Sequence, residues 1–321
     1  MTVLQIPEPG RAEWREAPDP EPGPGEILLD VSGVTTCPHW DLHVFDGEPM
    51  FADRPFAYPY VAGEPGHEAV GRVAVLGDGV DDLALGQRVA VWRDPGGRRQ
   101  GCYASLAPVE AAHVLPVPEA LDDADLAPLE LAMCVQVTFD QLAERGGVGG
   151  ARVGVSGLGP AGLIAVQLAK ANGAREVVAI DPVPERRALG RELGADRVLP
   201  PARGRFSAGR AGASACDVAI DTTGLVSAIE FLIERTADTV ALFGVLREPV
   251  RFPPSHWWGG FALLGYGEHN RAAAERALGR VVEGSLRLGP LVTHTLPLSR
   301  YAEGVERLRR KEAIKILFVP E

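Results

Sequence analysis

Three features are scarce in this sequence, and each scarcity excludes a kind of protein. Cysteine occurs four times in 321 residues, which is too few for a disulfide framework and favours a reducing compartment. Basic residues number 32 against 43 acidic ones, and the net charge of −11 argues against nucleic-acid partners and anionic membrane surfaces. No apolar run approaches the ~18 residues of a spanning helix, and the first residues lack the apolar stretch of a secretory signal. We therefore expect a cytoplasmic protein with neither a nucleic-acid nor a membrane partner.

The hydrophobic share is 46%, enough for a sizeable core, and the length favours about two domains. The chain up to about residue 115 is typical of a β-rich barrel or sandwich. Runs rich in β-branched residues at 26–31, 71–76 and 87–91 are separated by Gly, Pro and Asp turn signals. A helical stretch follows at residues 121–144.

After this helix the chain alternates strands with helices, which predicts a parallel sheet. The expected strands are 151–156, 176–180, 218–221 and 239–243, and the expected helices are 163–171 and 184–193. Residues 200–215 are rich in Gly, Arg, Ala and Ser and are expected to form a surface loop. A helix at 301–310 and a strand at 314–319 close the chain.

A glycine-rich turn stands between the first of these strands and its helix. It has the G-x-G-x-x-G spacing and reads Gly157-Leu158-Gly159-Pro160-Ala161-Gly162. In such a turn Gly157 permits the tight bend, Gly159 lets the backbone approach a pyrophosphate, and Gly162 allows close packing. The N-terminus of the following helix offers unpaired N–H groups to the phosphates, and Pro160 and Ala161 before it are included among the expected cofactor-binding residues. The context of strand, turn and helix predicts a Rossmann dinucleotide-binding domain.

An acidic residue, Asp181, ends the next expected strand, about 20 residues after the turn, where a carboxylate binds the adenosine ribose. A 2′-phosphate there would meet a like charge, so the sequence favours NAD over NADP. Arg186 and Arg187 follow closely and weaken this preference slightly; Arg186 is included among the expected cofactor-binding residues.

A second signal is the segment Gly66-His67-Glu68, followed by Gly71-Arg72-Val73. Together with the order of a β-rich half, a helix and a Rossmann signature, it resembles the zinc-containing medium-chain dehydrogenase/reductase family over essentially the whole chain. The resemblance implies an α/β protein, with a β-rich GroES-like catalytic domain and a doubly wound Rossmann cofactor domain. We expect residues 1–145 to form the catalytic domain, completed by 287–321, and residues 146–286 to form the cofactor domain.

The resemblance also implies one catalytic zinc per chain, held by Cys37, His67 and Cys134, with a fourth position left for water or substrate. Glu130, one helical turn before Cys134, is the alternative third ligand, as a carboxylate is in polyol-dehydrogenase relatives. Glu68 is expected beside the metal, and Asp41 is expected to orient His67 by hydrogen bonding its other ring nitrogen.

The chain departs from the family in two places. One additional residue separates Cys37 from Asp41, so His39 falls where a Ser or Thr usually relays the proton. The relay thus stays open among His39, His43, Thr35 and Thr36, and His39 is also conceivable as a ligand. The four-cysteine structural zinc lobe is absent, because residues 92–102 contain a single cysteine.

We therefore expect a zinc-dependent oxidoreductase that transfers a hydride between NAD(H) and a small alcohol or polyol, or its carbonyl partner. The alternatives are a zinc-free NAD(P)H-dependent quinone or enone reductase and a non-catalytic dinucleotide-binding protein. The resemblance and the apolar stretch 256–266 suggest a homodimer or homotetramer. Trp257 and Trp258 in that stretch are expected to fill an interface or the core.

Overall fold

The computed structural model describes residues 1–51, 53–93, 99–201, 212 and 215–321. Most of the loop expected at 200–215, and part of the segment 92–102, therefore lie outside the described residues. The chain divides into two compact units. Unit 1 consists of Met1–Leu131 and Leu288–Glu321, and unit 2 consists of Ala132–Arg287.

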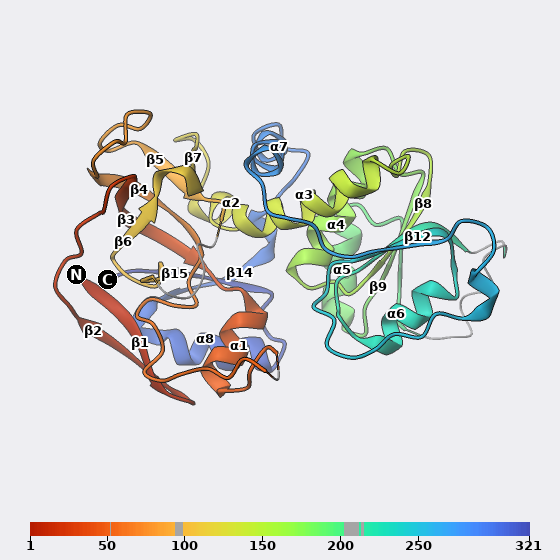
Figure 1. The fold of residues 1–321 in the computed structure, drawn as a ribbon, viewed down its shortest axis with the longest axis horizontal. Helices are drawn as coiled ribbons and strands as arrows, with labels where there is room; N and C mark the ends of the chain where they lie inside the picture. Colours follow the sequence, from red (N-terminus) through yellow and green to blue (C-terminus); the bar gives the residue numbers. More distant parts are fainter. Residues whose placement is uncertain (52, 94–98, 202–211, 213–214) are drawn as a thin grey trace. The chain divides into compact units, whose positions relative to one another are not determined.

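Unit 1 is built on a seven-stranded sheet and a separate hairpin (Figure 1). The hairpin pairs β1 (Thr2–Glu8) with β2 (Arg11–Glu16). The sheet strands are β3 (Glu26–Thr35), β4 (Glu68–Leu76), β5 (Arg88–Val91), β6 (Leu106–Glu110), β7 (Val114–Pro116), β14 (Val292–Pro297) and β15 (Lys315–Val319). Their order is β14-β15-β3-β4-β5-β7, with β6 also paired to β3. All pairs are antiparallel except β14 with β15, so the C-terminal residues complete this sheet.

Three helices belong to unit 1: α1 (Pro38–Asp46), α2 (Asp123–Leu126) and α8 (Tyr301–Arg309). Proline at the first position and a left-handed Gly47 after the last turn, at φ 75°, set the two ends of α1. The core of the unit joins the inward-facing residues of the sheet to the apolar side of α8. This packing places the start of α1 beside the ends of β3, β4 and β15.

Unit 2 contains a six-stranded parallel sheet (Figure 1). Its strands are β8 (Arg152–Ser156), β9 (Glu176–Ile180), β10 (Arg197–Leu199), β11 (Cys216–Asp221), β12 (Thr236–Leu242) and β13 (Ala262–Leu264). The spatial order β10-β9-β8-β11-β12-β13 is the Rossmann order, in which β8, β9 and β10 run toward one edge of the sheet and the chain then returns to place β11 on the other side of β8. Such sheets bind ligands at the carboxyl ends of the strands where the order reverses, so the turn after β8 lies at that point.

Four α-helices follow the first strand in the described part of unit 2, and the first three of them contact the sheet. They are α4 (Pro160–Ala171), α5 (Pro184–Glu192), α6 (Val226–Ile233) and α7 (Arg271–Val282). Helix α3 (Leu129–Ala143) contains the boundary between the two units. Trp257 and Trp258, expected in the core or an interface, are 78% and 74% exposed, so the core placement is wrong.

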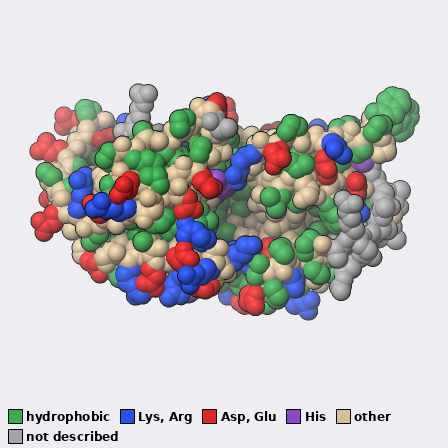
Figure 2. All heavy atoms as spheres, turned by 90° about the horizontal axis from the view of Figure 1, so that it is seen from below, with side chains coloured by type: hydrophobic (Ala, Val, Ile, Leu, Met, Phe, Trp, Pro, Cys, Tyr) green, Lys and Arg blue, Asp and Glu red, His purple; other side chains and the backbone are tan. Residues whose placement is uncertain are grey.

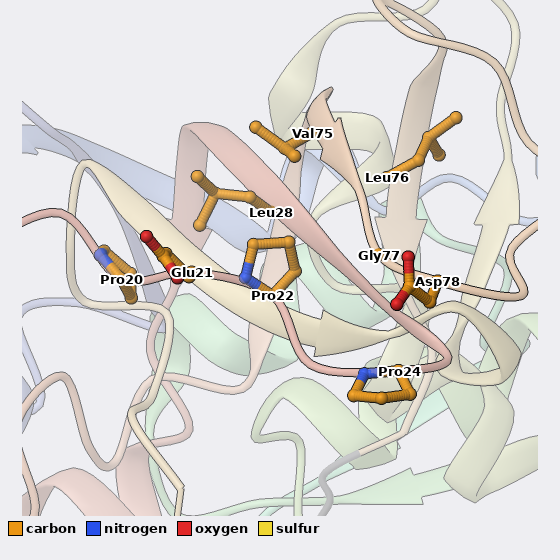
Figure 3. Close-up of a pocket in the computed structure, with 9 residues that line it drawn as sticks. All are labelled: Pro20, Glu21, Pro22, Pro24, Leu28, Val75, Leu76, Gly77 and Asp78. Atoms are coloured by element: carbon orange, nitrogen blue, oxygen red, sulfur yellow. The ribbon is translucent and has the colours of Figure 1, made fainter.

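The surface carries acidic and basic side chains side by side on the face shown in Figure 2. Unit 1 also has an open groove of about 390 Å³ beside the proline-rich segment before β3 (Figure 3). Its lining includes Pro22, Leu28 and Val75. None of the helices among the described residues is long and apolar enough to cross a membrane.

Candidate metal and dinucleotide sites

The first element of the candidate metal site is the junction between β3 and α1. Cys37 caps α1, and its carbonyl accepts the Asp41 N–H at 2.9 Å, so these two residues are one helical turn apart. The thiol is half-buried. The preceding Thr36 pairs through its backbone N–H and its hydroxyl with Ile316 of β15. The β-sheet therefore fixes the position from which Cys37 projects.

His67 and Glu68 stand at the start of β4, which pairs with β3. The register places Glu68 opposite Thr35, two residues before Cys37. The Cys37 sulfur, a His67 ring nitrogen and a Glu68 oxygen all lie within 4.8 Å of one another. His67 is 6% exposed and Glu68 is fully buried. Residues 30 positions apart in the sequence thus meet because two antiparallel strands bring them together.

Glu68 is held by a buried cation that the sequence analysis missed. Lys315 in β15 is fully buried, and its Nζ donates to Glu68 Oε1 at 2.6 Å and Oε2 at 2.5 Å, and to the Thr36 carbonyl at 2.5 Å. The Thr35 hydroxyl donates to Glu68 Oε2 at 3.0 Å. Both carboxylate oxygens of Glu68 therefore have hydrogen-bond partners within unit 1. The one signal in the sequence was a lysine inside the otherwise apolar strand 314–319.

Glu130, the alternative third ligand, lies beside His67 within unit 1. Its Oε2 is 3.8 Å from His67 Nε2, and the glutamate is 5% exposed. Ligands ~2.1 Å from a tetrahedral zinc are separated by about 3.4 Å, so this pair is close to the spacing that one ion requires. A thiol, an imidazole and a carboxylate are all ordinary zinc ligands.

Cys134, the first choice from sequence, is described within unit 2. Its sulfur lies 3.5 Å from Nε2 of His269, and the thiol is buried. This contact gives His269 a partner within unit 2. Thr138, one turn further along α3, is also buried.

Asp41 is fully buried and bound by two tyrosines. Its Oδ1 accepts hydrogen bonds from Tyr103 at 2.9 Å and Tyr301 at 2.8 Å. Its Oδ2 has no hydrogen-bond partner among the described residues. Burial raises the pKa of Asp41 to about 7, against the opposing effects of the two hydroxyls, His67 and Lys315. The expected bond from Asp41 to His67 stays a prediction.

The residues proposed for a proton relay fall into two groups. Thr35 and Thr36 have their hydroxyls engaged in the sheet, as described above. His39 and His43 lie on α1 with ring centroids 4.9 Å apart, and His43 Nδ1 is 2.7 Å from the Glu48 carbonyl oxygen. Among the described residues of unit 1, the possible metal ligands whose ligand atoms lie within 4.8 Å of one another are Cys37, His67 and Glu68. His39 does not belong to this group.

The glycine-rich turn follows β8 in unit 2. Gly157 has a φ of 88°, and a side-chain carbon there would lie 2.7 Å from Thr223. A carbon on Gly162 would lie 1.8 Å from the Gly157 carbonyl oxygen, so only glycine fits. At Gly159, which caps α4, no described atom lies within 4 Å of such a carbon. The turn is therefore tight on its protein side and open at the helix N-terminus.

Asp181 follows β9 and is 3% exposed. Its Oδ2 accepts the Leu158 N–H and its Oδ1 accepts the Val183 N–H, both at 2.7 Å. The carboxylate thereby links the end of β9 to the glycine-rich turn. Each carboxylate oxygen accepts two hydrogen bonds, so both retain capacity for a ribose. Arg186 is half-buried in the following helix α5, and its Nε has no hydrogen-bond partner among the described residues.

Two family models match the two parts of the chain. The alcohol dehydrogenase GroES-like domain matches residues 23–119, and the zinc-binding dehydrogenase domain matches residues 160–270. Sorbitol dehydrogenase of Macaca fascicularis is 30% identical over 98% of this chain and 94% of that protein. An L-threonine 3-dehydrogenase of Rhizobium rhizogenes is 26% identical over 99% of this chain and 98% of its own length.

Solved structures agree on the fold. That of 2R,3R-butanediol dehydrogenase from Bacillus subtilis superposes with a TM-score of 0.85 at 22% identity, covering 100% of this chain and 99% of that one. Galactitol-1-phosphate dehydrogenase from Escherichia coli gives 0.82 at 24% identity, with 100% of both chains covered. The fold class and the family resemblance expected from sequence are both confirmed. The chain belongs to the zinc-type medium-chain dehydrogenases, a family of oxidoreductases.

Proposed function

We propose that the chain is a zinc-dependent, NAD-linked dehydrogenase of small secondary alcohols or polyols. The observation that carries the proposal is the grouping of Cys37, His67 and Glu68 within 4.8 Å, with Glu130 Oε2 3.8 Å from His67 Nε2. The thiol, the imidazole and the Glu130 carboxylate are ordinary zinc ligands from separate segments, and none of them is needed to fill the apolar core. When bound, one zinc ion supplies Lewis acidity that favours loss of the substrate's hydroxyl proton.

Glu130 is proposed as the third ligand in preference to Cys134. Its support is the 3.8 Å separation between Glu130 Oε2 and His67 Nε2 inside one unit. Glu68 is proposed to stay beside the metal, because Lys315 and Thr35 hold both of its oxygens. The proton is proposed to leave through His39 and His43, which are both half-buried and therefore reach solvent.

The cofactor is proposed to be NAD, bound at the turn after β8. Gly157, Gly159 and Gly162 would admit the pyrophosphate at the N-terminus of α4, where Pro160 and Ala161 begin the helix. Asp181 would accept both ribose hydroxyls, and its charge would repel a 2′-phosphate. Arg186 would lie close to the adenosine end.

The substrate class is taken from the chemistry that the relatives' names share. Sorbitol, L-threonine and 2R,3R-butanediol each carry a secondary hydroxyl next to a carbon bearing a second hydroxyl or an amino group. We therefore favour a secondary alcohol with a neighbouring polar group. A homodimer or homotetramer is proposed too, because β13 is an edge strand and Trp257 and Trp258 nearby are exposed.

The test combines metal analysis with turnover. The purified chain is expected to contain one zinc, to lose activity on chelation, and to regain it with zinc. A screen of polyols and vicinal diols should give a higher kcat/KM with NAD than with NADP, and Asp181→Ala should reduce that preference. Full activity after chelation would favour the zinc-free reductase. Zinc and NAD binding without turnover of any alcohol or carbonyl would favour the non-catalytic protein. A monomer by light scattering at micromolar concentration would overturn the oligomer.

A further inference from the structure

One carboxylate oxygen of Asp41, Oδ1, accepts hydrogen bonds from two tyrosine hydroxyls, and the other, Oδ2, accepts none from the described residues. Asp41 lies on α1, Tyr103 lies shortly before β6, and Tyr301 begins α8. Asp41 and Tyr103 have no exposed surface and Tyr301 is 1% exposed. A buried carboxylate needs compensating donors, and two segments distant from α1 in the sequence provide two of them.

The two tyrosines are fixed by packing and not only by their hydroxyls. Their ring centroids are 5.2 Å apart at 62°, and both rings contact Phe318 of β15, at 5.7 Å and 5.5 Å. Two of these three contacts are edge-to-face and the third, between Tyr301 and Phe318, is tilted, so each ring is held by close aromatic packing. Each hydroxyl has a single proton to donate, and both donate it to Oδ1. These two hydrogen bonds to Oδ1 fix the orientation of the Asp41 carboxylate, and with it the position of Oδ2.

The second oxygen, Oδ2, is buried and has no hydrogen-bond partner among the described residues. An acceptor left in this state is unfavourable, so a donor is expected to use it in some state of the protein. His67 is close enough for its charge to act on Asp41. The Nε2 of His67 faces Glu130, which leaves Nδ1 on the opposite side of the ring.

We propose that Tyr103 and Tyr301 are positioning residues that hold Asp41 so that Oδ2 accepts the Nδ1–H of His67 when Nε2 binds zinc. A zinc-bound histidine is neutral, carries its proton on the other nitrogen, and nearly always donates it to a carboxylate, carbonyl or water. This inference rests on the proposed zinc site. It adds two residues from outside the ligand segments, one of them 234 positions after His67, to the set that determines metal affinity.

The experiment compares Tyr103→Phe, Tyr301→Phe and the double variant with the wild-type protein. Zinc affinity is measured by competition with a chelating dye, and stability by urea unfolding of the metal-free proteins. Removing such partners typically weakens metal binding 10- to 100-fold. We expect this range for the double variant and at least threefold for each single variant. Tyr58→Phe is the matched control, because it removes a partly buried hydrogen bond from a tyrosine hydroxyl to the Val44 carbonyl in the same unit. This variant should change zinc affinity less than twofold.

A second readout separates positioning from a general loss of packing. In the zinc-loaded protein with ¹⁵N-labelled histidine, the Nδ1–H of His67 should give a downfield proton signal, identified by its loss in His67→Gln. The signal should weaken or move upfield in the tyrosine variants and stay unchanged in Tyr58→Phe.

The outcomes are distinguishable. Wild-type protein that takes up no zinc overturns the proposed function and this inference together. A double variant that binds zinc as tightly as wild type, with an unchanged His67 signal, overturns the inference alone. If the double variant does not fold, Tyr301→Phe decides by the same threefold criterion.

Discussion

Replacing Lys315 with methionine should expose how strongly the buried ion pair with Glu68 is tied to folding. The lysine is fully buried, and its ammonium makes three contacts of 2.5–2.6 Å, two to Glu68 and one to the Thr36 carbonyl. Methionine preserves most of the volume and removes the charge. Glu68 would then keep only the Thr35 hydroxyl at 3.0 Å.

Breaking a buried pair by removing one partner is destabilising by about 3–5 kcal/mol, because the other charge stays buried and uncompensated. The lost bond to the Thr36 carbonyl contributes roughly 1 kcal/mol of that total. Domains are stable by about 5–15 kcal/mol, so the substitution should remove a large fraction of the stability of unit 1. Urea unfolding of the metal-free protein near pH 7, followed by far- and near-UV circular dichroism, measures the change.

Two further proteins make the measurement decisive. Lys170→Met is the matched control, since it breaks an exposed pair with Asp196 at 3.1 Å and should change stability by less than about 1 kcal/mol. Adding Glu68→Gln to Lys315→Met removes the orphaned charge and should restore at least half of the loss. A loss below about 1 kcal/mol for Lys315→Met, or a double variant no more stable than the single one, would refute the reasoning.

Three other predictions concern single side chains. Burial raises the pKa of the Asp41 carboxyl to about 7, so the folded metal-free protein binds the proton of this carboxyl more tightly than the unfolded chain does. The free energy of unfolding should therefore fall by about 4 kcal/mol as the pH rises from about 4 to about 7. In urea unfolding, Asp41→Asn should show a weaker dependence of stability on pH than wild type. Gly162→Ala should unfold at a lower temperature than wild type, because its added carbon would lie 1.8 Å from the Gly157 carbonyl oxygen. Gly159→Ala should have the melting temperature of wild type but bind NAD more weakly, as calorimetry would measure. Equal melting temperatures for the two variants would contradict the clash at Gly162. Burial raises the pKa of the Cys216 thiol to about 11, so native protein at pH 8 should resist iodoacetamide at this residue, as mass spectrometry of digests would show.

The cofactor domain was predictable because its signals are local. Gly157, Gly162 and Asp181 lie within 25 positions, and each has a backbone role that only its own residue type performs easily. The structure adds that Asp181 accepts the Leu158 N–H, so this carboxylate stabilises the glycine-rich turn in addition to its proposed contact with the ribose. Strand ends were less predictable, because β11 begins at Cys216 and not at 218, and helix α4 begins at Pro160 and not at 163.

The surroundings of the proposed metal site could not be predicted in the same way. Lys315 lies 247 positions from Glu68, and Tyr301 lies 260 positions from Asp41. In the sequence, both tyrosines are indistinguishable from ordinary core aromatics, and the lysine is a single polar residue in a strand. Their roles exist only because β15 and α8 return to the sheet that positions Cys37 and the start of β4. Pairing across such distances depends on topology, which no local pattern specifies.

The proposed third zinc ligand is the point on which the sequence and the structure favour different residues. Glu130 and Cys134 are one helical turn apart on α3, so periodicity directs them to the same side and the sequence alone left both open. The structure places Glu130 Oε2 3.8 Å from His67 Nε2, and places the Cys134 sulfur 3.5 Å from His269 Nε2. We therefore predict that Glu130→Gln loses most of its zinc while Cys134→Ser retains one zinc per chain. Elemental analysis after dialysis measures both, and unchanged circular dichroism serves as the control for folding. If Cys134→Ser loses its zinc and Glu130→Gln keeps it, then Cys134 and not Glu130 is the third ligand.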